Sequence, residues 1–448
     1  MKSIYHFIKN IFLDVTSSNN IKNLFSPIIF ILISIPFNKN INNVAIMYFF
    51  TIVLYNEIKK SKINLNVSFL FPIILYCIMI LSYLWSINRE TTLEALIKEL
   101  PLLILPVGFL TTNMLLYKRK LIIVQYHSYS MVLLAIFFLI RALFRYFLTN
   151  DVRVFFYHGE NDLDYGLVPK LLNAIHVSVF VAIGFFYFIS KEIKSKFDYC
   201  ASALLLGFIL LLSSKNIILV VILLSLIHFF YFSKSSHKLR LRNLIVFSLL
   251  VLLVFSYSTI KNRLAYEFQA HTKKSLSANV LEGIPKNVHF VSVKEAWQNK
   301  IFTPNDYFPG TAFRVYQFRI FTELISENKV FFTGFGLNAS YPKIEEKATQ
   351  YNLYKGSDVD PGYQNKNFHN QYIQVFAELG VFGFIILIII LLINLKNAFK
   401  TKDFVHFAFA ILMISLFLTE SFLWRQRGVV FFTLFYCLFN SNVSKKIE

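Results

Sequence analysis

The chain has 448 residues, of which 56% are hydrophobic and 16% are charged. Soluble globular domains carry about 25% charged residues, so this composition excludes an ordinary soluble protein and predicts a polytopic membrane protein. The net charge of +20 would indicate nucleic-acid binding in a soluble chain. Here the basic residues stand in short clusters between apolar runs, so we expect contact with membrane lipids and no nucleic acid.

Residues 1–22 form the first segment with a recognisable pattern. Ile4, Phe7, Ile8 and Ile11 recur at helical spacing among polar residues, and the pattern is not that of a cleavable signal. This predicts an amphipathic helix that lies in the membrane interface.

About 12 apolar runs follow, and a membrane-spanning helix needs roughly 17 to 25 residues. We therefore expect an all-α fold with about 12 transmembrane helices, nine within residues 23–260 and three within 371–440, and a tail at 441–448. The runs cover residues 23–37, 42–56, 67–84, 100–117, 121–140, 171–190, 198–212, 217–232, 243–260, 371–393, 404–419 and 428–440.

Lysine and arginine are distributed unevenly over the short connections. The connections on one side of the predicted membrane carry about twice as many as those on the other, a bias typical of cytoplasmic segments. This predicts that both termini lie in the cytoplasm. The one long connection, residues 261–370, would then be a large periplasmic loop.

The predicted periplasmic loop has few apolar runs, so we expect it to pack against the membrane helices. Apolar residues recur at helical spacing from Thr311 to about Asn328, which predicts an amphipathic helix. Gly334-Phe335-Gly336 predicts a turn.

The junction between this loop and the tenth apolar run carries the most specific motif. His369 and Asn370 are followed, after nine residues, by Gly380-x-x-Gly383. An imidazole titrates near neutral pH and can accept a proton from an attacking hydroxyl group. The motif resembles the signature of the O-antigen ligase family. The alternative is an interfacial histidine that only forms hydrogen bonds at a helix start.

A second motif lies on the predicted loop helix. Arg314 and Arg319 precede Gly334-Phe335-Gly336, and an Arg-led helix that closes on Gly-x-Gly resembles the same family of ligases and polymerases. A guanidinium group pairs with diphosphate oxygens in a bidentate way and stays charged. The alternative for both arginines is a solvated helix face.

Lys215 follows Ser214 between two apolar runs, where members of the family typically carry Ser-Arg. Lysine keeps the positive charge but loses the fork geometry. Arg141 and Arg145 lie one helical turn apart at the predicted outer end of the fifth span. We expect them to pair with a carboxylate such as Asp151 or with a substrate phosphate.

Residues 419–428 resemble the C-terminal end of Bacteroidetes-like members of the family. Within this segment Glu420 has three possible roles. It pairs with Arg425 or Arg427, orients His369, or contacts an acceptor sugar.

The resemblance implies a glycosyltransferase of the bacterial inner membrane that uses a glycan linked to undecaprenyl diphosphate as donor. His369 and Arg314 would be catalytic, and Lys215, Arg319, Arg141 and Arg145 would bind the donor diphosphate. Asn370, Glu420, Gly334 and Gly336 would orient these groups or the substrate. The family is regarded as metal-independent, and the sequence shows no metal-ligand spacing and no cofactor motif. The acceptor would be lipid A-core for a ligase or a glycan for a polymerase.

Two other classes remain open. One is a transporter of polysaccharide or lipid-linked sugar, for which Glu378 is the best candidate because it lies deeper along the helix than His369. The other is a non-catalytic partner in polysaccharide assembly. Clustering of the candidate residues at one membrane face favours the enzyme.

Two further expectations concern residue types. The three cysteines, Cys77, Cys200 and Cys437, stand in apolar runs, so we expect them to be buried and inert. The 51 phenylalanines and 24 tyrosines are expected mainly to face lipid and the membrane interfaces.

Overall fold

The structure is a computed structural model that describes residues 24–37, 39–58, 66–111, 115–156, 166–233, 288–356 and 362–441, with a few isolated positions elsewhere. The predicted interfacial helix at 1–22, the ninth apolar run at 243–260 and the tail at 441–448 fall almost entirely outside the described residues. The same is true of the loop before residue 288.

The described part of the chain is almost entirely helical. Its long elements are α3 (Phe25–Ser34), α4 (Lys39–Ile58), α5 (Val67–Ser82), α6 (Arg89–Glu99), α7 (Pro101–Thr111), α8 (Leu115–Thr149), α9 (Ala174–Ser190), α10 (Lys196–Leu211), α11 (Lys215–Ile227), α14 (Val293–Gln298), α15 (Gly310–Asn328), α16 (Tyr341–Gln350), α17 (Gln371–Thr401), α18 (Phe404–Phe417) and α19 (Gln426–Asn440). Short helical turns are η1 (Val152–Phe155), η2 (Lys170–Leu172), η3 (His228–Phe232) and η5 (Phe422–Trp424). Strands β1 (His289–Phe290) and β2 (Asp306–Tyr307) form one parallel pair.

Three described helices are long and apolar enough to cross a membrane, namely Arg119–Thr149, Lys215–Phe232 and Gln371–Thr401. Four shorter apolar helices accompany them, at Phe25–Ser34, Val67–Ser82, Ala174–Ser190 and Phe404–Phe417. These helices confirm a helical membrane protein. The number of about 12 spans stays a prediction.

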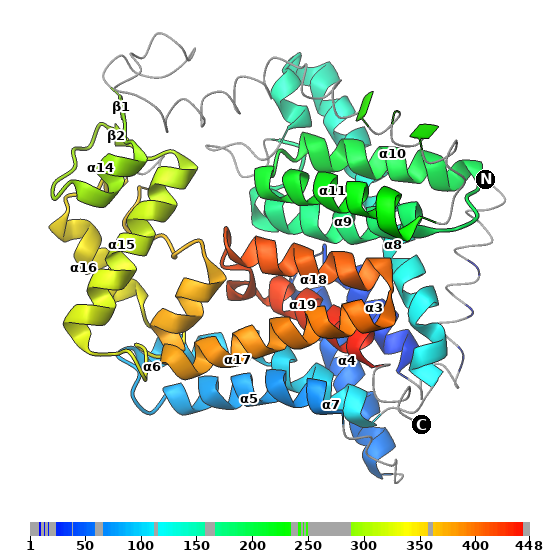
Figure 1. The fold of residues 1–448 in the computed structure, drawn as a ribbon, viewed down its shortest axis with the longest axis horizontal. Helices are drawn as coiled ribbons and strands as arrows, with labels where there is room; N and C mark the ends of the chain where they lie inside the picture. Colours follow the sequence, from blue (N-terminus) through cyan, green and yellow to red (C-terminus); the bar gives the residue numbers. More distant parts are fainter. Residues whose placement is uncertain are drawn as a thin grey trace.

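The elements form a bundle and a cap (Figure 1). Helix α17 packs between α5 and α18, while α9 packs between α8 and α10. The cap, residues 288–356, contains α14, α15 and α16 and lies at the end of the bundle where α17 begins (Figure 1). Its helix α15 matches the amphipathic helix predicted from Thr311 to about Asn328.

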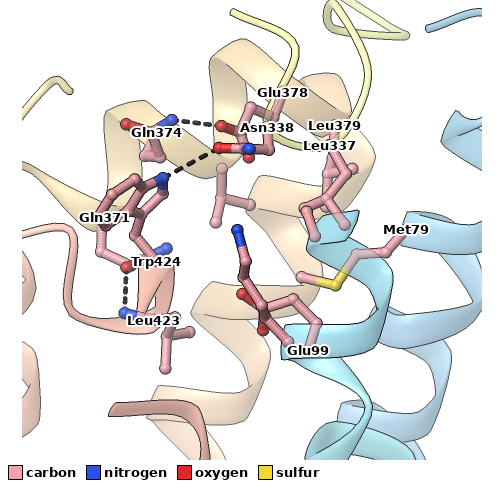
Figure 2. Close-up of a pocket in the computed structure, with 13 residues that line it drawn as sticks. Met79, Glu99, Leu337, Asn338, Gln371, Gln374, Glu378, Leu379, Leu423 and Trp424 are labelled. Atoms are coloured by element: carbon pink, nitrogen blue, oxygen red, sulfur yellow. Dashed lines mark hydrogen bonds between the residues drawn. The ribbon is translucent and has the colours of Figure 1, made fainter. Parts of the chain in front are cut away.

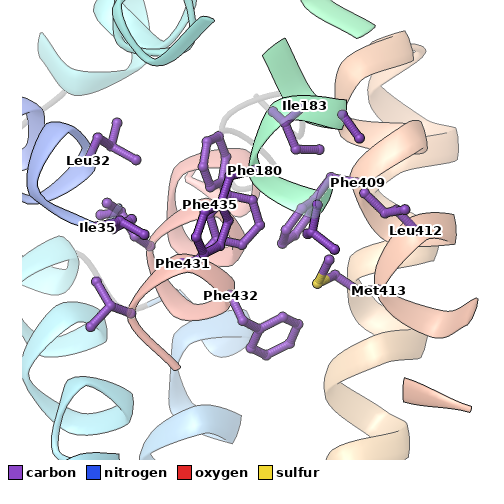
Figure 3. Packing of buried hydrophobic residues seen from close by; sticks show 14 of the residues in the cluster. Leu32, Ile35, Phe180, Ile183, Phe409, Leu412, Met413, Phe431, Phe432 and Phe435 are labelled. Carbon is purple, nitrogen blue, oxygen red and sulfur yellow. The ribbon is translucent and has the colours of Figure 1, made fainter. Parts of the chain in front are cut away.

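Helix α19 lies at the centre of the bundle, and every residue from Gly428 to Asn440 is buried. Its aromatic rings interlock with those of α9 and α18 (Figure 3). Ring centroids lie 4.7 Å apart for Phe180 and Phe431 and 5.8 Å apart for Phe409 and Phe435. A helix that is apolar all round is buried on all sides, so many phenylalanines fill the protein core and do not face lipid.

The cap has a hydrophobic core of its own, which includes Phe302, Phe308, Tyr316 and Ile344. This core continues onto Ala377 of α17. The cap is therefore both a folded unit and a layer packed on the bundle.

Helix α17 is interrupted at Gly380, whose φ of 66° and ψ of −167° belong to a backbone region essentially restricted to glycine. The interruption frees two carbonyl groups from the helical ladder. The backbone N–H of Phe335 donates to Ala377 at 2.8 Å, and that of Gly336 donates to Glu378 at 2.9 Å. The Gly-x-Gly turn of the cap therefore completes the hydrogen bonding of α17, as non-helical backbone at membrane depth requires.

The backbone that follows the interruption is also hydrogen-bonded to the cap. The N–H of Val381 donates to the carbonyl of Phe331 at 2.9 Å. A Cβ atom at Gly380 would overlap the carbonyl of Phe332, and one at Gly334 would overlap the backbone of Glu378. Glycine is required at both positions because φ is positive and because the backbones of the cap and α17 approach each other closely.

The expectation for the cysteines is wrong at two positions. Cys77 and Cys200 are exposed, and only Cys437 is buried. Each of these two cysteines lies on the outward face of its helix, which a run of uniform hydrophobicity does not distinguish from the inward face.

Candidate functional site

The segment between α18 and α19 brings several candidate residues together. The side chain of Arg314 on α15 donates to the carbonyl of Thr419 through Nε at 3.1 Å and Nη2 at 2.9 Å. Asn216 on α11 donates to Thr419 Oγ1 at 2.7 Å, and Asn370 at the start of α17 donates to the carbonyl of Leu418 at 3.1 Å. Four distant parts of the chain therefore meet at Thr419.

His369 lies directly before α17 with a left-handed φ of 47°. Its backbone N–H donates to Asn367 Oδ1 at 3.0 Å. Asn370 then caps the helix, because its Oδ1 accepts the N–H of Ile373 at 3.1 Å. The cap residue and the turn fix the point from which the imidazole projects.

The imidazole faces a buried carboxylate. His369 Nδ1 lies 3.6 Å from Glu420 Oε2, an ion-pair distance that is too long for a hydrogen bond. The ring also meets Phe313 edge-on, with centroids 6.0 Å apart. The His369 side chain keeps 30% exposure whereas that of Glu420 keeps 9%, so His369 is the accessible member of the pair.

Burial acts to raise the pKa of Glu420, but the neighbouring His369, followed by His176 and Arg314, lowers it by more, and the net pKa lies below its usual value. Glu420 therefore stays ionised at neutral pH. A carboxylate beside an imidazole fixes its orientation and stabilises its protonated form, which is the arrangement of a histidine prepared to take up a proton.

Glu420 does not pair with Arg425 or Arg427 as one expectation held. Both arginines donate through Nη1 to the carbonyl of Leu171 at 3.2 Å. Of the three roles considered for Glu420, the geometry favours orientation of His369.

Arg314 combines a structural and an electrostatic capacity. Besides its two bonds to Thr419, its Nη1 donates to the carbonyl of Gly310 at 2.9 Å. A guanidinium group has about five N–H donors, so these three bonds leave two donors for a ligand. Arg314 thus holds the Glu420 segment on the cap helix while presenting charge to the same region.

Lys215 is the first residue of α11, directly after the cap position Ser214. The next residue, Asn216, accepts from Ser415 at 2.7 Å and donates to Thr419. Lys215 is thereby anchored beside the same segment as Arg314 and Glu420.

Three of the predicted donor-binding residues lie elsewhere. Arg319 points into the cap, where it donates to Glu323 at 3.0 Å and to the carbonyl of Asn299 at 2.6 Å. Its guanidinium also lies over the ring of Tyr351, 4.5 Å from the centroid. These contacts give it a structural role within the cap.

Arg145 on α8 donates to the carbonyl of Gly166 at 2.9 Å. Asp151, the carboxylate considered as a partner for Arg141 and Arg145, pairs with Arg153 at 2.8 Å. None of the contacts of the Thr419 segment described above involves α8.

Gly334 and Gly336 act through the α17 interruption rather than by touching His369.

His176 and Asn216 also lie at this site and are not among the candidates predicted from the sequence. His176 is fully buried on α9, and its ring stacks on Phe422 with centroids 4.4 Å apart. Among the described residues neither ring nitrogen of His176 has a hydrogen-bond partner. A polar residue inside an apolar run is the signal that the sequence offers for each of them.

Within the described residues no group of three or more His, Cys, Asp or Glu side chains is placed to hold a metal ion. The expected chemistry of the site rests on one imidazole, one carboxylate and two cations.

No curated protein matches the chain. Residues 200–388 match the family model described as O-antigen ligase. This range contains Lys215, Arg314, His369 and Asn370. Residues 419–428, with Glu420, lie beyond it, so their resemblance to Bacteroidetes-like members stays a prediction. Over residues 200–388 the chain is therefore similar to the O-antigen ligase family, and this match supports a ligase- or polymerase-like membrane glycosyltransferase that acts on a lipid-linked glycan and an acceptor.

Proposed function

We propose that the protein transfers a glycan from undecaprenyl diphosphate to an acceptor sugar of lipid A-core, at the periplasmic face of the bacterial inner membrane. The observation that carries the proposal is the pairing of His369 with the buried Glu420, beside Arg314. Lys215 directly precedes Asn216, which binds the same segment. A base and nearby cations are what this transfer needs.

The reaction forms one bond and breaks one. The acceptor hydroxyl oxygen attacks the anomeric carbon of the glycan while His369 takes the hydroxyl proton. The bond between the anomeric carbon and the diphosphate oxygen breaks, and undecaprenyl diphosphate leaves with the electron pair. Arg314 and Lys215 stabilise the negative charge that grows on the departing diphosphate.

Arg319 is left out of this donor-binding set because the cap already occupies its guanidinium. Arg141 and Arg145 are left out because the contacts that gather at Thr419 come from α11, α15 and α17. No metal and no cofactor enters the proposed mechanism.

A repeat-unit polymerase is the alternative within the family, since it uses the same donor and differs in the acceptor. A transporter gains support from one observation, the buried Glu378 beside an interrupted helix. However, the interruption lies where the cap docks on α17, close to the outer end of that helix and not at its middle.

The test is transfer by the purified protein in lipid nanodiscs, supplied with an undecaprenyl-diphosphate-linked glycan and either lipid A-core or a second donor molecule as acceptor, without ATP. We expect a glycan-extended acceptor and released undecaprenyl diphosphate, with no product from His369→Ala. Product with lipid A-core identifies a ligase, and product only with the second donor identifies a polymerase. The proposal is wrong if wild-type protein forms no product but moves a fluorescent lipid-linked sugar across vesicles.

A further inference from the structure

A small cavity lies behind the His369 segment, between α6, α17 and the backbone at residues 337–338 and 423–424 (Figure 2). Its volume is about 20 Å³, enough for roughly one water-sized group. Unlike the aromatic core of the bundle, its wall carries two carboxylates, three side-chain amides and the ammonium group of Lys98.

The first carboxylate belongs to Glu99, the last residue of α6. Glu99 is 6% exposed, and among the described residues its Oε2 has no hydrogen-bond partner. Burial and then the nearby Glu378 raise the pKa of Glu99 well above its usual range. A buried polar atom without a partner is costly, so this oxygen is suited to a ligand that donates a hydrogen bond.

The second carboxylate, Glu378, lies across the cavity and accepts a hydrogen bond from Gln374 Nε2. In Figure 2 Glu99 lies below the space that Glu378 and Asn338 bound from above. The two acids belong to different helices and line the same cavity.

The remaining polar side chains, which are Lys98 and the amides, offer donors. Asn338 Oδ1 accepts the indole N–H of Trp424 at 2.9 Å, and Gln371 Oε1 accepts the backbone N–H of Leu423 at 2.8 Å. Because both amide oxygens are engaged, the amide nitrogens are what these side chains can offer to a ligand. A bound cation would lack neutral oxygen ligands here, whereas a hydroxyl group donates to a carboxylate and accepts from an amide at the same time.

The cavity and the candidate site share two walls. The start of α17 carries His369 on one side and Gln371 on the other. The segment after α18 carries Glu420 toward His369 and Leu423 toward Gln371. Trp424, at 37% exposure, adds a flat apolar surface with a polar edge at the cavity rim.

We propose that this cavity is an acceptor subsite, in which one hydroxyl group of the acceptor sugar donates a hydrogen bond to Glu99 Oε2 and accepts one from an amide of Gln371 or Asn338. The proposal rests on the proposed function. It assigns Glu99 a role in binding the acceptor and no role in donor binding or proton transfer.

The test compares Glu99→Gln with Glu94→Gln, an exposed glutamate on the same helix, in the transfer assay with lipid A-core. The raised pKa of Glu99 keeps its carboxyl group uncharged, and a hydrogen bond between uncharged groups contributes about 0.5 to 1.5 kcal/mol. We therefore expect Glu99→Gln to raise the acceptor KM roughly 2- to 10-fold, with donor KM and kcat close to wild type. Glu94→Gln should match wild type in every parameter.

Acceptors that each lack one hydroxyl of the terminal sugar give the decisive second measurement. One of them should raise the acceptor KM of the wild type by a similar factor and leave that of Glu99→Gln unchanged, because the two changes remove the same contact. The subsite is refuted if Glu99→Gln keeps the wild-type acceptor KM, or if donor and acceptor KM rise together.

Calorimetric titration of acceptor into wild type and Glu99→Gln separates this proposal from the reaction itself. If the variant binds the acceptor more weakly than wild type, the subsite is supported, even where wild type forms no product. Absence of product would refute only the proposed function. Equal binding by both proteins, or no binding by wild type, refutes the subsite.

Discussion

The double role of Arg314 leads to a prediction that separates its charge from its geometry. Arg314→Lys keeps the positive charge, but a single ammonium group cannot reproduce the bidentate contact with the carbonyl of Thr419 together with the bond to Gly310. At the lower end of the range for charged donors, the two bonds to Thr419 are worth on the order of 3 kcal/mol. The same energy added to the reaction barrier corresponds to roughly 100-fold in rate.

We therefore expect Arg314→Lys to lower kcat by about 100-fold, since displacement of the Thr419 segment also displaces Glu420 from His369. Donor KM should change little because the charge remains. Arg314→Ala, which removes both properties, should cost more in kcat and also weaken donor binding. The assay is steady-state transfer with donor and acceptor varied separately.

Arg319→Lys is the matched control, because this arginine lies on the same helix but contacts only the cap. It should lower the thermal stability of the protein and leave kcat within about 2-fold of wild type. A wild-type kcat in a correctly inserted Arg314→Lys protein would refute the role of the Thr419 contact.

Four further predictions follow from the same contacts. His369→Gln should lower the transfer rate by roughly 100- to 10,000-fold, and the remaining rate should no longer rise with pH near neutrality. A wild-type rate in this variant would show that His369 is not the base. The depressed pKa of Glu420 means that its contribution to stability is complete above its unfolded pKa of about 4.3 and is lost as pH falls further. The difference in melting temperature between wild type and Glu420→Gln should accordingly shrink on acidification, and a constant difference would contradict the pairing. Transfer should survive EDTA, and loss of activity with rescue by one specific cation would reveal a metal site. In a cysteine-free background, a cysteine at Lys355 should react with an impermeant reagent from the periplasmic side and one at Lys400 should not, while the reverse pattern would invert the topology.

The sequence was sufficient for elements that depend on local spacing. The loop helix was predicted from Thr311 to about Asn328 and spans Gly310–Asn328, because its apolar positions recur with the period of the helix itself. The start of α17 at Gln371 could likewise be predicted, since a polar cap residue stands directly before an apolar run.

Contacts between distant segments could not be predicted in the same way. Arg314 and Arg319 lie on one helix and have the same chemistry, and only the packing of α15 gives one to Thr419 and the other to the cap interior. Sequence proximity favoured Arg425 or Arg427 as the partner of Glu420, whereas the fold brings His369 to it from another helix. The Gly380-x-x-Gly383 motif gave no sign of an interrupted helix, because the groups that stabilise the interruption lie about 45 residues earlier in the chain.

The interruption at Gly380 also constrains the order of assembly. Helix α17 cannot occupy a bilayer by itself without leaving the carbonyls of Ala377 and Glu378 unpaired in an apolar medium, a cost of several kcal/mol for each group. The N–H groups of Phe335 and Gly336 that pair with them precede α17 in the chain and are synthesised first. The docking edge therefore precedes the helix that needs it, so insertion of α17 and its docking on the cap should be a single cooperative event.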